Sequence, residues 1–109
     1  MIQLKEGVKV THLTPQLLLA IHVVDGAYES VGIHQCFITS LDDGKHGPTT
    51  LHGTGQAADF RLHNVPQMKR PALVERIKVS LRDQEGEYEV YWEGVGTDSE
   101  HLHVEYQPK

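Results

Sequence analysis

The sequence predicts one α+β domain over residues 1–109, with two helices and a small, mostly antiparallel sheet. The length of 109 residues is close to that of one common domain and leaves no room for a second core. Apolar periodicity indicates elements in the order helix, strand, loop, strand, helix, strand, strand, which is typical of this fold class. A composition of 39% hydrophobic and 23% charged residues excludes a disordered chain.

The two predicted helices have clear beginnings and ends. Thr14 is a candidate N-cap with Pro15 at the first helical position, and Gly32 ends the pattern. The apolar stripe of this first helix is Leu17, Ile21, Val24 and Tyr28. The second helix is expected to begin near Pro71 and to end before Gly86. The apolar residues Leu73, Ile77 and Leu81 lie on one face of this second helix.

Strand-forming residues cluster in residues 33–39, 57–62, 87–92 and 101–107. The last two segments are separated by a turn over residues 94–99 and therefore predict a hairpin. Alternation in the last strand places Leu102, Val104 and Tyr106 on one face. The opposite face carries His101, His103 and Glu105. Residues 40–55 contain four glycines and predict a long loop, which in a small domain is often functional.

Charge and cysteine content exclude several classes of protein. The net charge is −5 and the basic residues are scattered, so neither a nucleic-acid partner nor an anionic membrane surface is indicated. The one cysteine, Cys36, excludes an internal disulfide and a cysteine-based zinc site, and its apolar neighbours predict a buried thiol. We expect synthesis in the cytoplasm without a signal peptide, no transmembrane segment, and a monomer.

Eight histidines in 109 residues direct attention to metal binding or acid–base chemistry. His52 lies in a glycine-flanked loop seven residues before Asp59, at the start of a predicted strand. His103 follows Glu100 and His101 in the last predicted strand. Two imidazoles and one carboxylate are a plausible ligand set for catalytic zinc, with a fourth position left for water. The alternative from spacing alone is that these residues form a turn, a cap and a solvated strand face.

The order and spacing of these motifs resemble those of the zinc D-Ala-D-Ala metallopeptidase family. The first motif reads Thr50-Leu51-His52-Gly53-Thr54-Gly55-Gln56-Ala57-Ala58-Asp59, and the second reads His101-Leu102-His103-Val104-Glu105. That family shares its fold with the hedgehog signalling domain and includes phage cell-wall endopeptidases. His46, six residues before His52, is similar to a position of the hedgehog domain. The resemblance implies a hedgehog/DD-peptidase-like fold.

The resemblance also implies roles for individual residues. Its zinc ligands would be His52, Asp59 and His103. Glu100 would be the general base, with Glu93 as the alternative. His101 would stabilise the oxyanion, and His46 would contact substrate at the rim. His63, four residues after Asp59, is a lesser candidate for supporting the site. His12 and His22 are expected to be exposed, and His34 is expected to be a surface or edge residue of a strand.

The activity implied by the resemblance is hydrolysis of peptide bonds in peptidoglycan stem peptides. Family members that remove a terminal D-Ala usually carry an arginine before the first ligand. Residues 33–52 contain no arginine, and Lys45 is the only cation there, so an endopeptidase is indicated as strongly as a carboxypeptidase. A phage lysis enzyme acting at the cell wall is the corresponding expectation. The alternative function is a non-catalytic, zinc-binding, hedgehog-like domain that binds a partner through its cleft.

Overall fold

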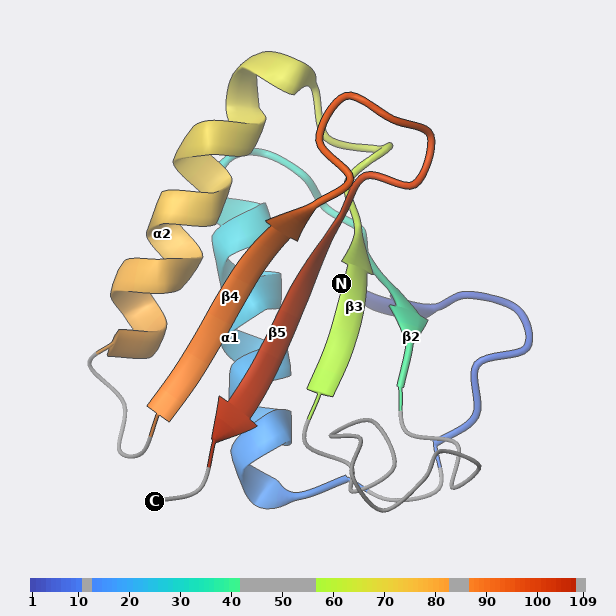
Figure 1. Cartoon of the computed structure of the whole chain (residues 1–109), viewed down its shortest axis with the longest axis vertical. Coiled ribbons are helices and arrows are strands. Elements are labelled where there is room, and N and C mark those ends of the chain that lie inside the picture. Colours follow the sequence, from blue (N-terminus) through green and yellow to red (C-terminus); the bar gives the residue numbers. More distant parts are fainter. Residues whose placement is uncertain (11–12, 42–56, 83–86, 108–109) are drawn as a thin grey trace.

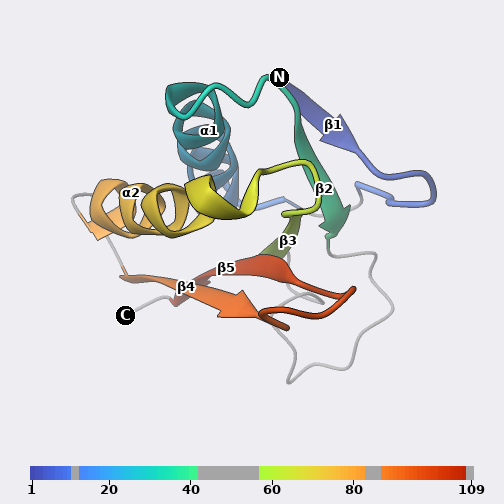
Figure 2. The ribbon, with the colours of Figure 1, turned by 90° about the horizontal axis from the view of Figure 1, so that it is seen from above.

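A computed structural model describes residues 1–10, 13–41, 57–82 and 87–107. The predicted α+β class is confirmed. In chain order the elements are β1 (Ile2–Leu4), α1 (Pro15–Ser30), β2 (Cys36–Ser40), β3 (Ala57–Arg61), the 3₁₀ helix η2 (Gln67–Lys69), α2 (Arg70–Arg82), β4 (Glu87–Glu93) and β5 (His101–Gln107). The strands form one sheet in the order β1-β2-β3-β5-β4. Figure 1 labels β2 to β5, and Figure 2 also labels β1. Only the β1–β2 pair among these is parallel.

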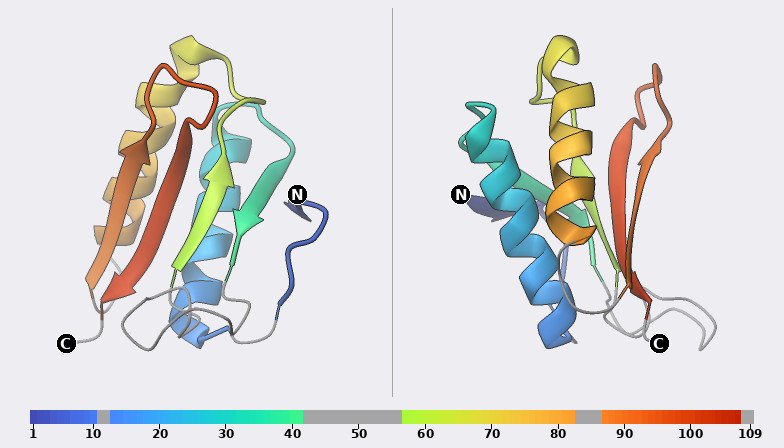
Figure 3. Two further views of the ribbon diagram at one scale, coloured as in Figure 1. Left: turned by 45° about the vertical axis from the view of Figure 1, so that its right-hand side comes forward. Right: turned by 90° about the vertical axis from the view of Figure 1, so that its left-hand side faces the viewer.

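Both helices pack against the same face of the sheet (Figures 2 and 3). The core between them is formed by α1, α2 and alternate strand residues, including Ala58, Phe60, Leu102 and Val104. Because side chains alternate along a strand, the intervening residues of β3 and β5 lie on the opposite face, which we call the outer face. These residues include Asp59, Arg61, His101, His103 and Glu105.

Helix α1 begins as its sequence predicts. The backbone N–H of Leu17 donates to the Thr14 hydroxyl oxygen at 3.1 Å, and Pro15 occupies the first turn. The helix ends where Gly32 adopts a φ of +84°, a conformation that glycine reaches without strain. No described helix has the length and hydropathy that crossing a membrane requires.

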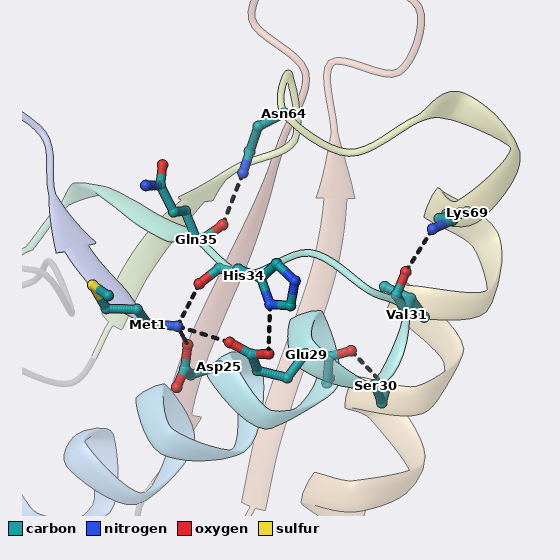
Figure 4. Close-up of polar contacts among 10 residues, drawn as sticks. Met1, Asp25, Glu29, Ser30, Val31, His34, Gln35, Asn64 and Lys69 are labelled. Carbon is teal, nitrogen blue, oxygen red and sulfur yellow. Dashed lines mark hydrogen bonds and ion pairs between the residues drawn. The ribbon is translucent and has the colours of Figure 1, made fainter.

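Strand β1 was not predicted, and it makes the sheet mixed. Three residues are too few to show an alternating pattern, so its parallel pairing with β2 becomes evident only in the folded chain. The α-amino group of Met1 lies 2.9 Å from an Asp25 carboxylate oxygen and 3.1 Å from a Glu29 oxygen (Figure 4). These contacts connect the beginning of β1 to α1.

Strand β2 begins at Cys36, three residues later than predicted. The carbonyl of His34 accepts from the α-amino group of Met1 at 2.6 Å, and the carbonyl of Gln35 accepts from the Asn64 amide at 2.8 Å. Both carbonyls therefore bond outside the sheet, as Figure 4 shows. Cys36 itself is fully buried as predicted, and burial raises the pKa of its thiol to about 12.

One buried hydroxyl links α1 to the end of β3. Tyr28 is fully buried, and its hydroxyl donates to the carbonyl of Arg61 at 2.6 Å. Tyr28→Phe keeps the ring but leaves that carbonyl without this donor, so we expect a loss of about 1–2 kcal/mol in the free energy of unfolding, measured in urea. Tyr88→Phe is the matched control, because its hydroxyl bonds to the Gln16 carbonyl at an exposed position. Equal losses in both variants would contradict the role of burial.

Candidate functional site

Asp59 and His103 lie side by side on the outer face. The antiparallel register of β3 and β5 places them directly opposite each other. His103 Nδ1 lies 2.7 Å from Asp59 Oδ1, and its Nε2 lies 2.8 Å from Glu105 Oε1. The side chains of His103 and Asp59 are 16% and 21% exposed. The imidazole is thus held between two carboxylates in a half-buried position.

These two carboxylates change the acid–base behaviour of the imidazole. The hydrogen bond with Asp59 is the largest cause, and it raises the pKa of His103 to about 9 against the opposing effect of burial. The bond with Glu105 and both negative charges act in the same direction. In the metal-free protein His103 is therefore protonated at neutral pH, and a metal that takes Nδ1 must displace a proton.

The contacting atoms suit a zinc ion. Asp59 Oδ1 and His103 Nδ1 are donor types that zinc accepts, and they converge from two rigid strands. With Nδ1 on the metal, Nε2–H would donate to Glu105, the kind of carboxylate contact that orients metal-bound histidines. His52 and His46 lie outside the described residues. Within the described ranges, no three or more His, Cys, Asp or Glu residues gather as a metal site.

A pocket of about 390 Å³ opens beside Asp59. It brings together four of the residues singled out from the sequence, namely Asp59, His63, Glu100 and His101. Two cations, Lys5 and Arg61, also line it. Chain segments far apart in the sequence, from Lys5 after β1 to the start of β5, therefore build one concave site.

His101 lies at the edge of this pocket. Its Nδ1 is 2.6 Å from the Ser99 carbonyl oxygen, and its Nε2 is 3.1 Å from Glu93 Oε1. Glu93 belongs to β4, is 51% exposed at its side chain and does not line the pocket. Since β5 lies between β4 and β3, Glu93 is separated from Asp59 by a whole strand. This arrangement favours Glu100 over Glu93 as the base.

Glu100 is the most buried carboxylate among the described residues, at 5% exposure. Its Oε1 accepts from Arg70 Nη1 at 2.9 Å and from the Gly96 backbone N–H at 3.1 Å. Its Oε2 accepts from Trp92 Nε1 at 2.8 Å. The Gly96 N–H is the largest cause that lowers the pKa of Glu100, followed by Trp92, with Arg70 adding to both. Glu100 is therefore ionised and firmly oriented, and it is one of the residues that line the pocket.

Sequence reasoning did not find Arg70. It lies thirty residues before Glu100, in a segment whose pattern signals only a helix beginning. Trp92 was interpreted as a core and sheet residue, and its indole does pack against the core. The local pattern carried no signal for its bond with Glu100, because that bond depends on the hairpin geometry.

Of the remaining histidines, one described residue, His63, lies at the pocket. His22 and His34 are exposed, as predicted, and His12 lies outside the described residues. His63 lines the pocket, but its Nε2 lies 2.6 Å from the Asp98 carbonyl oxygen. It therefore supports the loop between β4 and β5 that forms one wall of the pocket.

The His103 contacts predict how the stability of the metal-free protein depends on pH. The pKa of His103 in the folded state lies above the ordinary value of about 6.5. The contribution of its contacts to the free energy of unfolding is therefore fully present below pH 6.5 and is lost as pH rises through about 9. After solvent screening is allowed for, we expect a loss on the order of 1–2 kcal/mol over this window. Urea unfolding of chelator-treated protein would measure it. His103→Gln should flatten the profile, and an unchanged slope in that variant would contradict the assignment.

Comparison of the chain with protein-family models, with curated proteins and with solved structures gives no match. Inference about function therefore depends on the chemistry of the site and on the sequence motifs.

Proposed function

We propose that the chain is a zinc-dependent peptidase that acts on peptidoglycan stem peptides. The observation that carries the proposal is the contact between Asp59 and His103 on the outer face, beside a pocket lined by Glu100 and His101. The sequence motif adds His52 as the third ligand. Bound zinc would supply a Lewis acid that polarises the peptide carbonyl and lowers the pKa of water.

The residues at the pocket divide the remaining chemistry between them. The ionised Glu100 would take a proton from the attacking water and deliver it to the leaving amine. His101 would donate a hydrogen bond to the oxygen on which negative charge develops. Asp59 and His103 would hold the metal, and Glu105 would keep the His103 ring in orientation through Nε2.

The charges at the pocket bear on substrate class. The segment before His52 contains no arginine to bind a substrate carboxylate. Lys5, just after β1, and Arg61, the last residue of β3, supply positive charge at the pocket instead. A peptide with a free carboxylate near its scissile bond, such as a wall peptide, suits this arrangement. We propose action at the cell wall, as for phage lysis enzymes, with either endopeptidase or carboxypeptidase cleavage.

A non-catalytic zinc-binding domain of hedgehog-like type is the second candidate. It is favoured by one observation, namely that the Glu100 carboxylate is already bound by Arg70, Trp92 and Gly96. In such a domain Glu100 would only stabilise the loop between β4 and β5, and the pocket would bind a partner without cleaving it.

Digestion of purified peptidoglycan separates the two candidates. The zinc-loaded protein is expected to release fragments whose masses, found by mass spectrometry, correspond to one hydrolysed peptide bond. Chelation should abolish release, and added zinc should restore it. Intact stem peptides after prolonged incubation with zinc-loaded protein would contradict the peptidase and favour the binding domain.

A further inference from the structure

We propose that Arg70 and Trp92 are positioning residues that hold the Glu100 carboxylate in one orientation at the pocket, with Oε2 as the oxygen that accepts the proton. The inference rests on the proposed role of Glu100 as general base. It adds two residues, one from α2 and one from β4, that the sequence motifs do not include.

The Arg70 guanidinium is fixed at two points. Its Nε donates to the Val65 carbonyl at 2.8 Å, and its Nη1 donates to Glu100 Oε1 at 2.9 Å. The side chains of Arg70 and Glu100 are only 11% and 5% exposed. A charge-assisted bond at such low exposure is strong and sensitive to geometry. The first residue of α2 therefore fixes one carboxylate oxygen.

Trp92 fixes the other oxygen. It lies opposite Leu102 in the β4–β5 ladder, and its indole N–H donates to Oε2 at 2.8 Å. An ionised carboxylate has about four acceptor positions, two on each oxygen. Oε1 receives two donors, from Arg70 and Gly96, whereas Oε2 receives one from the described residues. Oε2 thus has an acceptor position that no described residue occupies, which is what a base requires.

The remaining charged groups around the pocket do not replace these contacts. They are Lys5, Asp59, Arg61, His63, Asp98 and His101. None of these six forms a hydrogen bond with Glu100 in the described part of the chain, so Arg70 is the cation paired with it there. Loss of Arg70 or Trp92 would let the carboxylate rotate, and small misplacement of a reacting group is costly in rate.

The test compares Trp92→Phe, Arg70→Lys and Arg70→Met with the wild type on a wall-peptide substrate. Trp92→Phe removes the N–H donor and replaces the indole with a smaller aromatic ring at the same place, so kcat should fall about tenfold at unchanged KM and zinc content. Arg70→Met should lower kcat further and also lower the melting temperature, and Arg70→Lys should recover the melting temperature but only part of kcat. Arg76→Met is the matched control, since Arg76 is an exposed arginine on the same helix.

A second readout does not depend on turnover. In zinc-loaded protein with ¹³C-labelled glutamate carboxyl groups, an NMR titration reports the pKa of Glu100 directly. It should be higher in Trp92→Phe and Arg70→Lys than in the wild type, and the acid limb of the rate profile should move in the same direction. A wild-type kcat in both Trp92→Phe and Arg70→Lys, with both variants folded, would overturn the proposal. An unchanged Glu100 titration in these variants would also overturn it. Failure of the wild type to cleave any wall peptide would instead contradict the proposed function. The titration would still test whether Arg70 and Trp92 hold the Glu100 carboxylate.

Discussion

Glu100→Gln is expected to lower kcat on a wall-peptide substrate by about 10²–10⁴-fold while zinc remains bound. The amide has nearly the shape of the carboxylate but cannot accept a proton at neutral pH. Zinc content should stay at about one per chain because Glu100 is not among the proposed ligands. Steady-state kinetics together with elemental analysis of the same sample would measure both quantities.

Two further variants, Glu100→Asp and Glu93→Gln, are needed to interpret this result. Glu100→Gln removes the charge partner of the buried Arg70, so its melting temperature must be recorded. Glu100→Asp keeps that charge but shortens the reach, and it should also be slow. Glu93→Gln alters the exposed carboxylate next to His101 and should remain close to the wild type in kcat. A slow Glu93→Gln beside an active Glu100→Gln would assign the base to Glu93.

Removal of either proposed strand ligand should abolish zinc binding. Asp59→Ala and His103→Ala each delete one of two donor atoms that lie 2.7 Å apart, and a three-ligand site reduced to two should not retain zinc through dialysis. The His52→Ala variant should behave in the same way. Glu105→Gln leaves all three proposed ligands in place but weakens the contact with His103 Nε2, so zinc affinity should fall by about 10–100-fold without complete loss.

Native mass spectrometry would measure the zinc bound to each variant. His34→Ala is the control, because His34 is an exposed histidine paired with Glu29 on the helix side of the molecule. It should keep the wild-type zinc content. Full zinc occupancy in both Asp59→Ala and His103→Ala would exclude these residues as ligands.

The elements that could be predicted from sequence are those with strong local signals. Helix α1 has a capping threonine, a proline in its first turn and a regular apolar stripe, and it begins where these residues indicate. The bounds of β5 match the alternating segment. Strand β1 has only three residues, and its pairing with β2 depends on contacts more than thirty residues away. No local pattern encodes such a pairing.

The same distinction applies to the site. Alternation within β5 was enough to place His101 and His103 on one face. The register that sets His103 opposite Asp59 comes from strand pairing across forty-four residues, and only the sequence motif suggested that the two would meet. Arg70 and Trp92 belong to no motif, and their contacts with Glu100 follow from the packing of α2 and the hairpin against the pocket.

Anomalous diffraction at the zinc absorption edge, from crystals grown with stoichiometric zinc, tests the central claim most directly. We expect one strong peak on the outer face, at about 2.0–2.2 Å from both Asp59 Oδ1 and His103 Nδ1, with Nε2 still on Glu105. The third protein ligand in the density should be His52. A peak located away from Asp59 and His103, or no ordered zinc in well-diffracting crystals, would contradict the account.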